Sequence, residues 1–518
     1  MKTHQVQQKT ERRISAALRL VFVAALLLGQ IALAFFLSTE LRQRAAIIYT
    51  VLELAAFGYA VRIYNRTDGT SYKFGWIFLV LTVPVVGLIL YFLWNGDRQQ
   101  KRLDLKKLPM PEEPEAQQAA HRIQMEKLRR KFPQWERLSV YLSRQGYLLY
   151  GDTETRYLPT GEMFLQDMLE KLEQAEHFIF LEFFIIAQGQ IWDRMEEIFR
   201  RKAAAGVEVK IIFDDFGSMM RFPAGQIEAL RESGVEVQVF NPVHHYVNRL
   251  YFNYRDHRKI VCIDGSTAYT GGANVADEYA NLTVRFGYWK DCGIRLDGPG
   301  AWGLTREFLH MWQRNGGQLM QERDYYRPHD HHREAAGFCQ PFVDGPDNNP
   351  ISTAEDVFLH LINNARRSVH ITTPYLAIDE PMRQALCSAG DSGVDVRLLL
   401  PGIPDHKFAY LAAQSHYGEL LVHRVKIYIY EPGLLHGKTV LSDGEAAFVG
   451  SVNMDYRSFQ LHFECGTVLY GVPAIEGLAE DIQRITDRSR RVTYQEWKSR
   501  PWYRKLLSTL LRLFEMWM

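Results

Sequence analysis

The sequence predicts an α/β protein in which N-terminal transmembrane helices precede two related halves, each built from a largely parallel sheet with helices on its faces. Three observations lead to this prediction. Long uncharged apolar segments occur within the first hundred residues. From about residue 145 onward, amphipathic helical patterns alternate with short apolar strands. A set of five residue types then recurs at identical offsets, 179 residues apart, which indicates a duplication.

Residues 1–95 are expected to form a membrane region of two or three helices. Leu20–Leu37 is almost entirely apolar and Phe74–Trp94 carries no charge, so each is long enough to cross about 30 Å of hydrocarbon as a helix. Ala45–Val61 has a similar length but contains Glu53, so it is either a third span or a buried or interfacial helix. Basic residues flank the region on both sides, and the cluster that follows it is assigned to the cytoplasm.

The remainder of the chain is expected to contain a linker and two halves. Residues 96–135 combine prolines and an acidic run with a stretch of polar helix formers, which predicts a linker followed by a solvated or interfacial helix. The first half is assigned to residues 136–325. The helix and strand pattern starts again near residue 350, so the second half is assigned to residues 340–518.

The first half shows the alternation most clearly. An amphipathic helix at Phe164–Ala175 precedes an apolar strand at Phe178–Ile186. A second helix follows and ends at Ala205, where Gly206 is a typical stop signal, and the next strand is predicted at Glu208–Phe213. This order is typical of strands joined by helical crossovers.

Each half then carries one copy of the repeated motif. The first copy, "DHRKIVCIDGSTAYTGGAN", contains His257, Lys259, Asp264, Gly265 and Asn274. The second, "LHGKTVLSDGEAAFVGSVN", contains His436, Lys438, Asp443, Gly444 and Asn453. An apolar run, Asp-Gly and a second apolar run predict a hairpin, on which His and Lys two places apart face the same side. The aspartates fall in the turn and are expected to bind turn and neighbouring backbone, while each asparagine returns near the His and Lys.

The motif residues suit phosphate chemistry better than metal binding. An imidazole, an ammonium group, a carboxamide and backbone N–H groups on one surface can hold a phosphate. With two copies, one histidine attacks phosphorus in line and becomes a phosphohistidine, while the other protonates the leaving oxygen and then deprotonates an alcohol or water. Two lysines and two asparagines stabilise the developing charge, so neither a metal nor a cofactor is expected.

Composition excludes several other classes. The 518 residues carry 61 basic and 60 acidic side chains, and this net charge of +1 argues against a dedicated nucleic-acid binder. The five cysteines are odd in number and scattered, without a C-x-x-C pair. They therefore indicate neither a disulfide framework nor a zinc site.

The double H-x-K-x4-D pattern resembles the phospholipase D superfamily, and segments such as "HFIFLEFFII", "FNYRDHRKIVCIDG" and "VGSVNMDYRSFQLHFE" resemble bacterial cardiolipin synthases. The resemblance extends from roughly residue 45 to the C-terminus. It implies a multi-pass protein of the bacterial inner membrane that transfers a phosphatidyl group between two phosphatidylglycerol molecules, with anionic lipid as its partner. A phospholipase D hydrolase, or a transferase that uses another alcohol, remains an alternative. A non-catalytic scaffold is disfavoured because both motifs are intact.

The same resemblance implies roles for the motif residues. His257 would be the nucleophile and His436 the general acid and base. The residues expected to bind phosphate are Lys259, Lys438, Asn274 and Asn453, helped by Ser451. Asp264 and Asp443 complete the two motifs.

Two acids outside the motifs are also implied. Asp291 and Glu464 stand where the family keeps acids that orient the catalytic histidines, although a surface or salt-bridged acid is an alternative for each. Gly272 occupies the position that Ser451 has in the second half, so one hydroxyl contact is expected to be missing from the first half.

The C-terminal segment "WKSRPWYRKLLSTLLRLFEMWM" predicts an amphipathic helix with leucines on one face and several cations. Two placements remain open. The helix packs on the protein's own core, or it lies in the anionic headgroup layer of a membrane.

Overall fold

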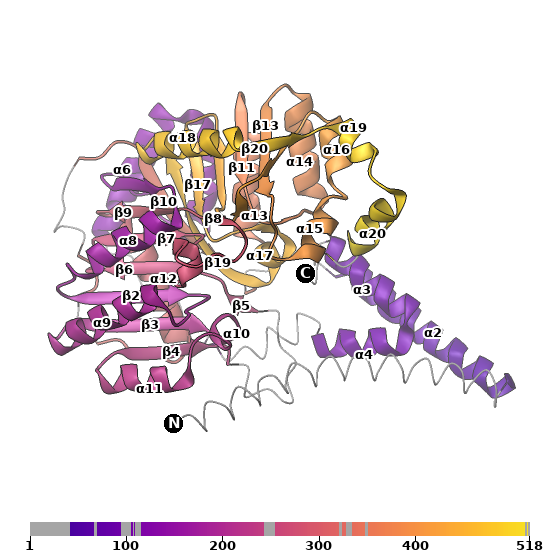
Figure 1. Ribbon diagram of the computed structural model, residues 1–518, viewed down its shortest axis with the longest axis horizontal. Helices are drawn as coiled ribbons and strands as arrows, with labels where there is room; N and C mark the ends of the chain where they lie inside the picture. The colour runs from indigo at the N-terminus through magenta and orange to yellow at the C-terminus, as the bar shows by residue number, and fades with distance from the viewer. Residues whose placement is uncertain are drawn as a thin grey trace. The chain divides into compact units, whose positions relative to one another are not determined.

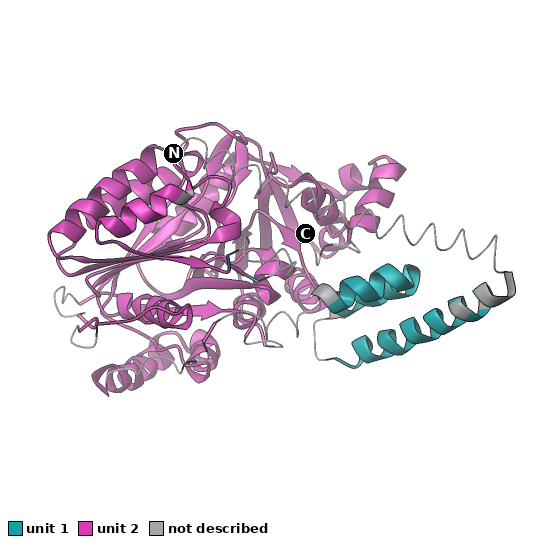
Figure 2. Ribbon diagram, turned by 90° about the horizontal axis from the view of Figure 1, so that it is seen from below, with its two compact units in different colours: residues 1–103, 242–254 teal, residues 104–241, 255–518 magenta. Residues whose placement is uncertain are grey.

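The computed structural model describes residues 42–66, 70–94, 105–106, 108, 115–242, 254–320, 324–327, 334–347, 351–512 and 515. The predicted span Leu20–Leu37 lies outside these residues, as do the basic clusters on either side of the membrane region. The chain divides into two compact units (Figure 2). One comprises residues 1–103 and 242–254, and the other comprises residues 104–241 and 255–518.

The N-terminal unit contains three described helices, α2 (Arg42–Tyr64), α3 (Thr70–Thr82) and α4 (Pro84–Trp94). The prediction of one continuous helix over Phe74–Trp94 is wrong, because α3 ends before Pro84 and α4 begins at this proline, where a missing N–H is tolerated. Gly87 permits a close approach of the two helices, since a Cβ there would lie 2.5 Å from the Leu79 carbonyl oxygen. Within the described ranges, no helix has the combination of length and apolarity that a membrane span requires.

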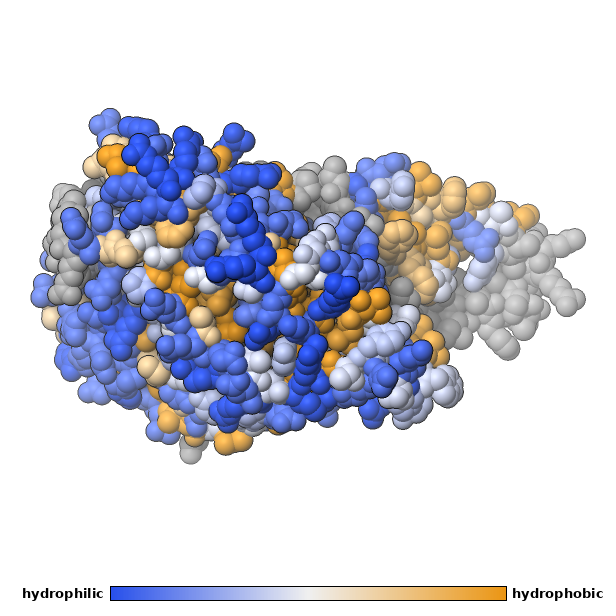
Figure 3. All heavy atoms as spheres, turned by 90° about the horizontal axis from the view of Figure 1, so that it is seen from above, coloured by the Kyte–Doolittle hydropathy of each residue, from blue (hydrophilic) through white to orange (hydrophobic). Residues whose placement is uncertain are grey.

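The helices of this unit nevertheless expose apolar side chains. On α2, Ile47, Leu54 and Phe57 are each more than 60% exposed, and Phe74 on α3 is 60% exposed. Figure 3 shows apolar atoms in orange along these helices at the right of the view. Such contiguous apolar surface is unusual for a helix surrounded by water.

The first half of the larger unit is a seven-stranded mixed sheet in the order β1-β9-β7-β6-β2-β3-β4 (Figure 1). Its strands are β1 (Glu154–Leu158), β2 (Phe178–Phe183), β3 (Glu208–Asp214), β4 (Glu236–Phe240), β6 (Lys259–Ile263), β7 (Thr267–Gly271) and β9 (Gly293–Asp297). Its helices are α8 (Gly161–Leu172), α9 (Gln190–Ala204), α10 (Asp215–Ser218), α11 (Ala224–Glu232), η2 (Asp277–Ala280) and α12 (Ala301–Arg314). Every residue of β2 and β3 is buried, as expected for strands covered by helices on both faces.

The second half repeats this order as β10-β19-β17-β16-β11-β13-β14 and adds β20 at the end. Its main strands are β10 (Phe338–Asp344), β11 (Ser368–Thr372), β13 (Asp395–Pro401), β14 (Lys426–Tyr430), β16 (Thr439–Ser442), β17 (Ala446–Gly450), β19 (His462–Tyr470) and β20 (Ser489–Val492). Its helices are α13 (Thr353–Asn363), α14 (Glu380–Asp391), α15 (Lys407–Ala413), α16 (Tyr417–Val422), α17 (Tyr456–Gln460), α18 (Ala474–Asp487), α19 (Tyr494–Lys498) and α20 (Trp502–Arg512). The position-by-position match of the two sheets confirms the predicted duplication.

The prediction that the sheets are largely parallel is wrong. In the first sheet only the β2–β3 and β3–β4 pairs are parallel, since these are the strands joined by the crossover helices α9 and α11. The motif hairpin β6–β7 and its neighbours β2 and β9 pair antiparallel. The second sheet has the same mixture, with β11, β13 and β14 parallel to one another.

Short strands connect the two halves. β5 (Arg255–Asp256) pairs in parallel with the start of β19 in the second half. β15 (Gly433–Leu435) pairs in parallel with β8 (Tyr288–Lys290) of the first half. A further short pair, β12 (Leu376–Ala377) with β18 (Met454–Asp455), lies within the second half. The residue after β5 is His257 and the residue after β15 is His436, so each motif begins where its chain contacts the other half.

The segment that leads into the first half is helical, as expected. It forms α6 (Glu115–Lys131), the short helix η1 (Pro133–Trp135) and α7 (Glu136–Arg144). Leu128, Trp135 and Leu138 from these three elements are fully buried. The polar helix predicted after the linker is therefore attached to the body of the larger unit through part of its surface.

Candidate active site

The two motifs place their histidines and lysines in equivalent buried positions. His257 precedes β6 and is 8% exposed, and His436 precedes β16 and is 6% exposed. Lys259 and Lys438 are completely buried. The hairpin turns have positive φ values at Asp264 and at the following glycine, 52° and 70°, and the second motif matches with 55° and 69°. This is the turn geometry that Asp-Gly favours.

The motif aspartates do not meet the histidines. Asp264 lies at the other end of β6, where its carboxylate accepts hydrogen bonds from the backbone N–H groups of three residues at the start of β2, Glu176, His177 and Phe178. Asp443 accepts the equivalent bonds from Arg366, Arg367 and Ser368 before β11. The structural role expected from the turn position is confirmed, and neither carboxylate touches the reacting groups.

Each histidine is bound by an acid from the opposite half. His257 Nδ1 lies 2.9 Å from Glu464 Oε1 and 3.0 Å from Oε2. His436 Nδ1 lies 2.6 Å from Asp291 Oδ2. Both acids are fully buried, so they are not surface carboxylates. An Nδ1–H that donates to a carboxylate leaves Nε2 of the same ring to attack phosphorus or to carry a proton, and Nε2 of His436 lies 3.1 Å from Lys438 Nζ.

The ionisation of these groups follows from burial and from the neighbouring cations. Burial lowers the pKa of His257 well below its ordinary value, and the charges of Lys259 and Lys438 lower this pKa further. Burial and Lys438 lower the pKa of His436, although Asp291 opposes the shift. Burial alone would raise the pKa of Asp291, but His436 and Lys438 outweigh it and hold the value at about 2. Without substrate, both imidazoles are therefore neutral near pH 7.

The lysines are folded back on their own motifs. Lys259 Nζ donates to the His257 carbonyl at 2.6 Å, and Lys438 Nζ donates to the His436 carbonyl and lies 2.8 Å from His436 Nδ1. Burial lowers the pKa of Lys259 to about 7 and also lowers the pKa of Lys438. An anion in the site would favour the charged ammonium form of both groups.

The other residues predicted to bind phosphate make different contacts in the two halves. Asn274 uses both ends of its amide, accepting from Ile185 N at 3.1 Å and donating to the Tyr279 hydroxyl at 2.7 Å. The Oδ1 of Asn453 is buried and has no hydrogen-bond partner among the described residues. Ser451 Oγ donates to Glu464 and accepts from Cys465 N at 2.9 Å, so in this structure it positions the acid.

Gly272, the counterpart of Ser451, has no space for a side chain. A Cβ at this position would lie 2.2 Å from Asp291 Oδ1. The missing hydroxyl is therefore a consequence of how closely Asp291 approaches the backbone of the first half. The two acids are held differently, Glu464 by a serine and Asp291 by the Cys292 backbone N–H at 2.9 Å.

Several ring neighbours of the histidines were not predicted, and two of them, His462 and Trp289, correspond between the halves. The ring of His462 lies 5.5 Å from that of His257, and the ring of Trp289 lies 5.4 Å from that of His436. His462 and Trp289 are equivalent, because each stands two residues before the acid of its half. The segments "HFE" and "WKD" could have indicated these neighbours, because residues two apart on a strand face the same side.

His257, His462 and Glu464 bring ligand-type atoms within 4.8 Å of one another. Arg457 Nε donates to His462 Nε2 at 3.3 Å, which places the proton of the neutral ring on Nδ1 and removes the lone pair that a metal would need there. The nearby charges of Lys259 and Lys438 also oppose a cation. The residues therefore fit an anion better than a metal ion.

Comparisons with known proteins identify the family of this chain. The family model "Cardiolipin synthase, PLD-like domain" matches residues 168–284 and 358–486, and "Phospholipase_D-nuclease N-terminal" matches residues 54–95. Cardiolipin synthase 2 of Bacillus anthracis is 33% identical over 89% of each chain. The major cardiolipin synthase of Bacillus subtilis is 31% identical over 87% of this chain and 94% of the relative.

Among solved structures, phosphatidylserine synthase from Haemophilus influenzae superposes with a TM-score of 0.56 at 14% identity. The match covers 74% of this chain and all of that one, and it supports the fold alone. The family model and the curated relatives establish that the chain belongs to the bacterial cardiolipin synthase family of the phospholipase D superfamily.

Proposed function

We propose that this protein is a cardiolipin synthase that transfers the phosphatidyl group of one phosphatidylglycerol to a second phosphatidylglycerol and releases glycerol. The observation that carries the proposal is the pair of buried histidines, each oriented through Nδ1 by an acid of the opposite half. The similarity to cardiolipin synthases over most of the chain supports the choice of substrate.

In the first step, Nε2 of His257 attacks phosphorus, and the bond between phosphorus and the glycerol oxygen breaks as the P–N bond forms. His436, which takes up a second proton on Nε2 when the anionic substrate binds, gives this proton to the departing glycerol oxygen. The phosphorylated imidazole gains a positive charge, which Glu464 stabilises across the 2.9 Å contact. Lys259 and Lys438 stabilise the negative charge on the phosphoryl oxygens.

In the second step the roles of His436 are reversed. Its neutral Nε2 removes the proton from a hydroxyl of the second phosphatidylglycerol, whose oxygen attacks phosphorus while the P–N bond breaks. The chemistry returns His257 to its neutral form with its proton on Nδ1. Asp291 stabilises the protonated form of His436 in both steps, because Asp291 Oδ2 lies 2.6 Å from His436 Nδ1.

The alternative is hydrolysis, or transfer to another alcohol, which would use the same residues and differ only in the acceptor. The low exposure of both histidines, 8% and 6%, supports transfer, because water has restricted access to the phosphohistidine. The proposed substrates are lipids, so neither nucleic acid nor a metal has a part in this scheme.

We also infer that the protein is held at the bacterial inner membrane by its N-terminal unit, with the catalytic unit on the cytoplasmic side. The exposed apolar side chains of α2 and α3 and the family match over residues 54–95 support this location. The predicted spans Leu20–Leu37 and Phe74–Trp94 would then lie within the bilayer region, the second as the broken pair α3 and α4.

The decisive test is product analysis by mass spectrometry after incubation of the purified full-length protein with isotopically labelled phosphatidylglycerol. Cardiolipin and glycerol in equal amounts support the proposal. Phosphatidic acid as the sole lipid product would replace it with the hydrolase. The His257→Ala protein is the control, because it should form neither product nor a covalent adduct.

A further inference from the structure

The C-terminal helix α20 turns its apolar residues outward. Ser508 is 2% exposed and is the one buried residue of the helix within the described range. The largest apolar side chains are far more exposed, Trp502 at 75%, Leu506 at 51% and Leu510 at 48%. A helix that stabilises its own protein buries its leucines, so the core placement considered for this helix does not describe α20.

Polar contacts hold α20 and its flanking residues in place. The Trp497 indole N–H donates to the Gln414 carbonyl at 2.9 Å, and Arg500 Nη1 donates to the Gln414 side chain at 2.6 Å. Beyond the helix, Glu515 lies 3.0 Å from Nε2 of the buried His416. The leucines are thus presented at the surface by an anchored helix.

α15 lies against α20 and extends the exposed apolar area. Its Phe408 is 67% exposed. We call this area the α15–α20 patch, defined by Phe408, Trp502, Tyr503, Leu506, Leu507 and Leu510. Exposed cations accompany the patch, Lys407 on α15 and Arg504 and Arg512 on α20.

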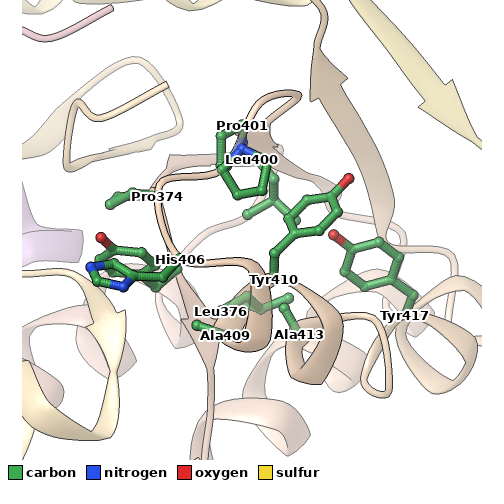
Figure 4. A pocket seen from close by; sticks show the side chains of 11 residues that line it. Pro374, Leu376, Leu400, Pro401, His406, Ala409, Tyr410, Ala413 and Tyr417 are labelled. Atoms are coloured by element: carbon green, nitrogen blue, oxygen red, sulfur yellow. The ribbon is translucent and has the colours of Figure 1, made fainter. Parts of the chain in front are cut away.

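α15 also borders a pocket of the second half. His406, Ala409 and Tyr410 line this small pocket, which is partly open to solvent (Figure 4). Figure 4 shows His406 at one end of the pocket and Tyr417 at the other. The buried hydroxyl of Tyr417 has no hydrogen-bond partner among the described residues.

The pocket is connected to the second motif through one strand segment. Tyr375, a lining residue, has its carbonyl bound by the Thr373 hydroxyl at 2.9 Å. The same hydroxyl accepts from Met454 N at 3.0 Å, next to Asn453 of the motif. Asp405, just before α15, accepts from the Tyr375 hydroxyl at 2.5 Å, and its charge acts to raise the pKa of His436, so the start of α15 lies near the second motif.

We propose that the α15–α20 patch docks on the surface of an anionic phospholipid bilayer, so that the acceptor lipid reaches His436 past α15; this rests on the proposed function. Apolar and aromatic side chains flanked by cations are complementary to an anionic interface. At 11 residues α20 is about 16 Å long, too short to cross a bilayer, so it would lie in the interface.

A fluorescent label on the full-length protein tests the docking directly. All five native cysteines are buried, which allows a single exposed cysteine to be labelled selectively. Leu510→Cys carries an environment-sensitive dye, and the protein is reconstituted into vesicles of phosphatidylglycerol or phosphatidylcholine that contain lipid-borne quenchers. Val284→Cys, at a position 86% exposed in the first half, is the matched control.

In phosphatidylglycerol vesicles, the fluorescence emission of the label at position 510 should shift to shorter wavelength and be quenched. The emission of the label at position 284 should show neither change. Equal behaviour of the two labels would overturn the proposal. Loss of quenching together with disulfide cross-linking between unlabelled Leu510→Cys copies would also overturn it, since the patch would then contact a second copy of the chain.

A kinetic test separates docking from chemistry. For Leu510→Glu, the ratio of cardiolipin formation on phosphatidylglycerol vesicles to that on monomeric short-chain phosphatidylglycerol should fall about tenfold relative to Val284→Glu. An unchanged ratio would contradict the docking. If the unsubstituted protein makes no cardiolipin from either substrate, the proposed function fails, and the quenching result still decides whether the patch binds lipid.

Discussion

Replacing Asp291 with asparagine tests whether each histidine depends on an acid of the other half. Asp291 Oδ2 lies 2.6 Å from His436 Nδ1, and its cationic neighbours lower its pKa from 3.8 to about 2. That difference corresponds to roughly 2 kcal/mol, or about one to two orders of magnitude in an equilibrium constant, and His436 and Lys438 both contribute to it. Because the interaction is mutual, Asp291→Asn should lower the pKa of His436 and reduce its protonated fraction by up to this factor.

The assay compares two donors in rapid-quench experiments that measure phosphohistidine. Phosphatidylglycerol has a poor leaving group that needs the proton of His436, whereas a p-nitrophenyl phosphatidyl ester does not. Asp291→Asn should slow adduct formation from phosphatidylglycerol by roughly one to two orders of magnitude and spare the ester. Glu464→Gln should slow both donors, because it acts on the nucleophile His257.

Asp297→Asn is the matched control. Its carboxylate bonds Arg295 at 2.7 Å in the same half and touches neither histidine, so both rates should be retained. Equal slowing of both donors by Asp291→Asn would refute the assignment of this acid to His436. Selective slowing of phosphatidylglycerol by Glu464→Gln would reverse the roles of the two histidines.

Further outcomes are expected at Gly272, Lys259 and Asp264. Gly272→Ala should reduce cardiolipin synthesis at least tenfold, because its Cβ would meet Asp291 Oδ1 at 2.2 Å, whereas Gly225→Ala, in open space, should retain the rate. With a pKa of about 7, Lys259 should lose its charge as pH rises above 7, so kcat/KM should fall there, and Lys259→Arg should flatten the profile. Between pH 7 and the ordinary value of 10.5 the unfolded lysine keeps the proton that the folded one has lost, so thermal stability should rise with pH. Asp264→Ala should lower the free energy of unfolding by about 1–3 kcal/mol in thermal denaturation, while adduct formed per folded molecule stays unchanged.

The repeated motif allowed the central residues to be predicted because its information is local. His and Lys two places apart on a strand face the same side, and Asp-Gly specifies the turn, so the placement of His257, Lys259 and their counterparts followed from spacing alone. The capping role of Asp264 also follows from its place in the turn.

Other features depend on tertiary packing, which the spacing of residues along the sequence does not reveal. The sequence placed Asp291 and Glu464 near the histidines only by resemblance, and it did not indicate that each acid serves the histidine of the other half. The mixed sheet was missed because apolar strands look alike whether their neighbours are parallel or antiparallel. The break at Pro84 was missed because a proline is compatible with a continuous membrane helix as well as with the start of a new one.

Because each acid binds the histidine of the other half, the two halves restrict one another's substitutions during evolution of the family. His257 and Glu464 are 207 residues apart, and His436 and Asp291 are 145 apart, yet each pair must match in length and charge. A substitution in one repeat is therefore compensated only by a substitution in the other. Among relatives, covariation should connect the two repeats crosswise, and a chimaera that combines repeats from different members should be active only when both crossed pairs come from compatible parents.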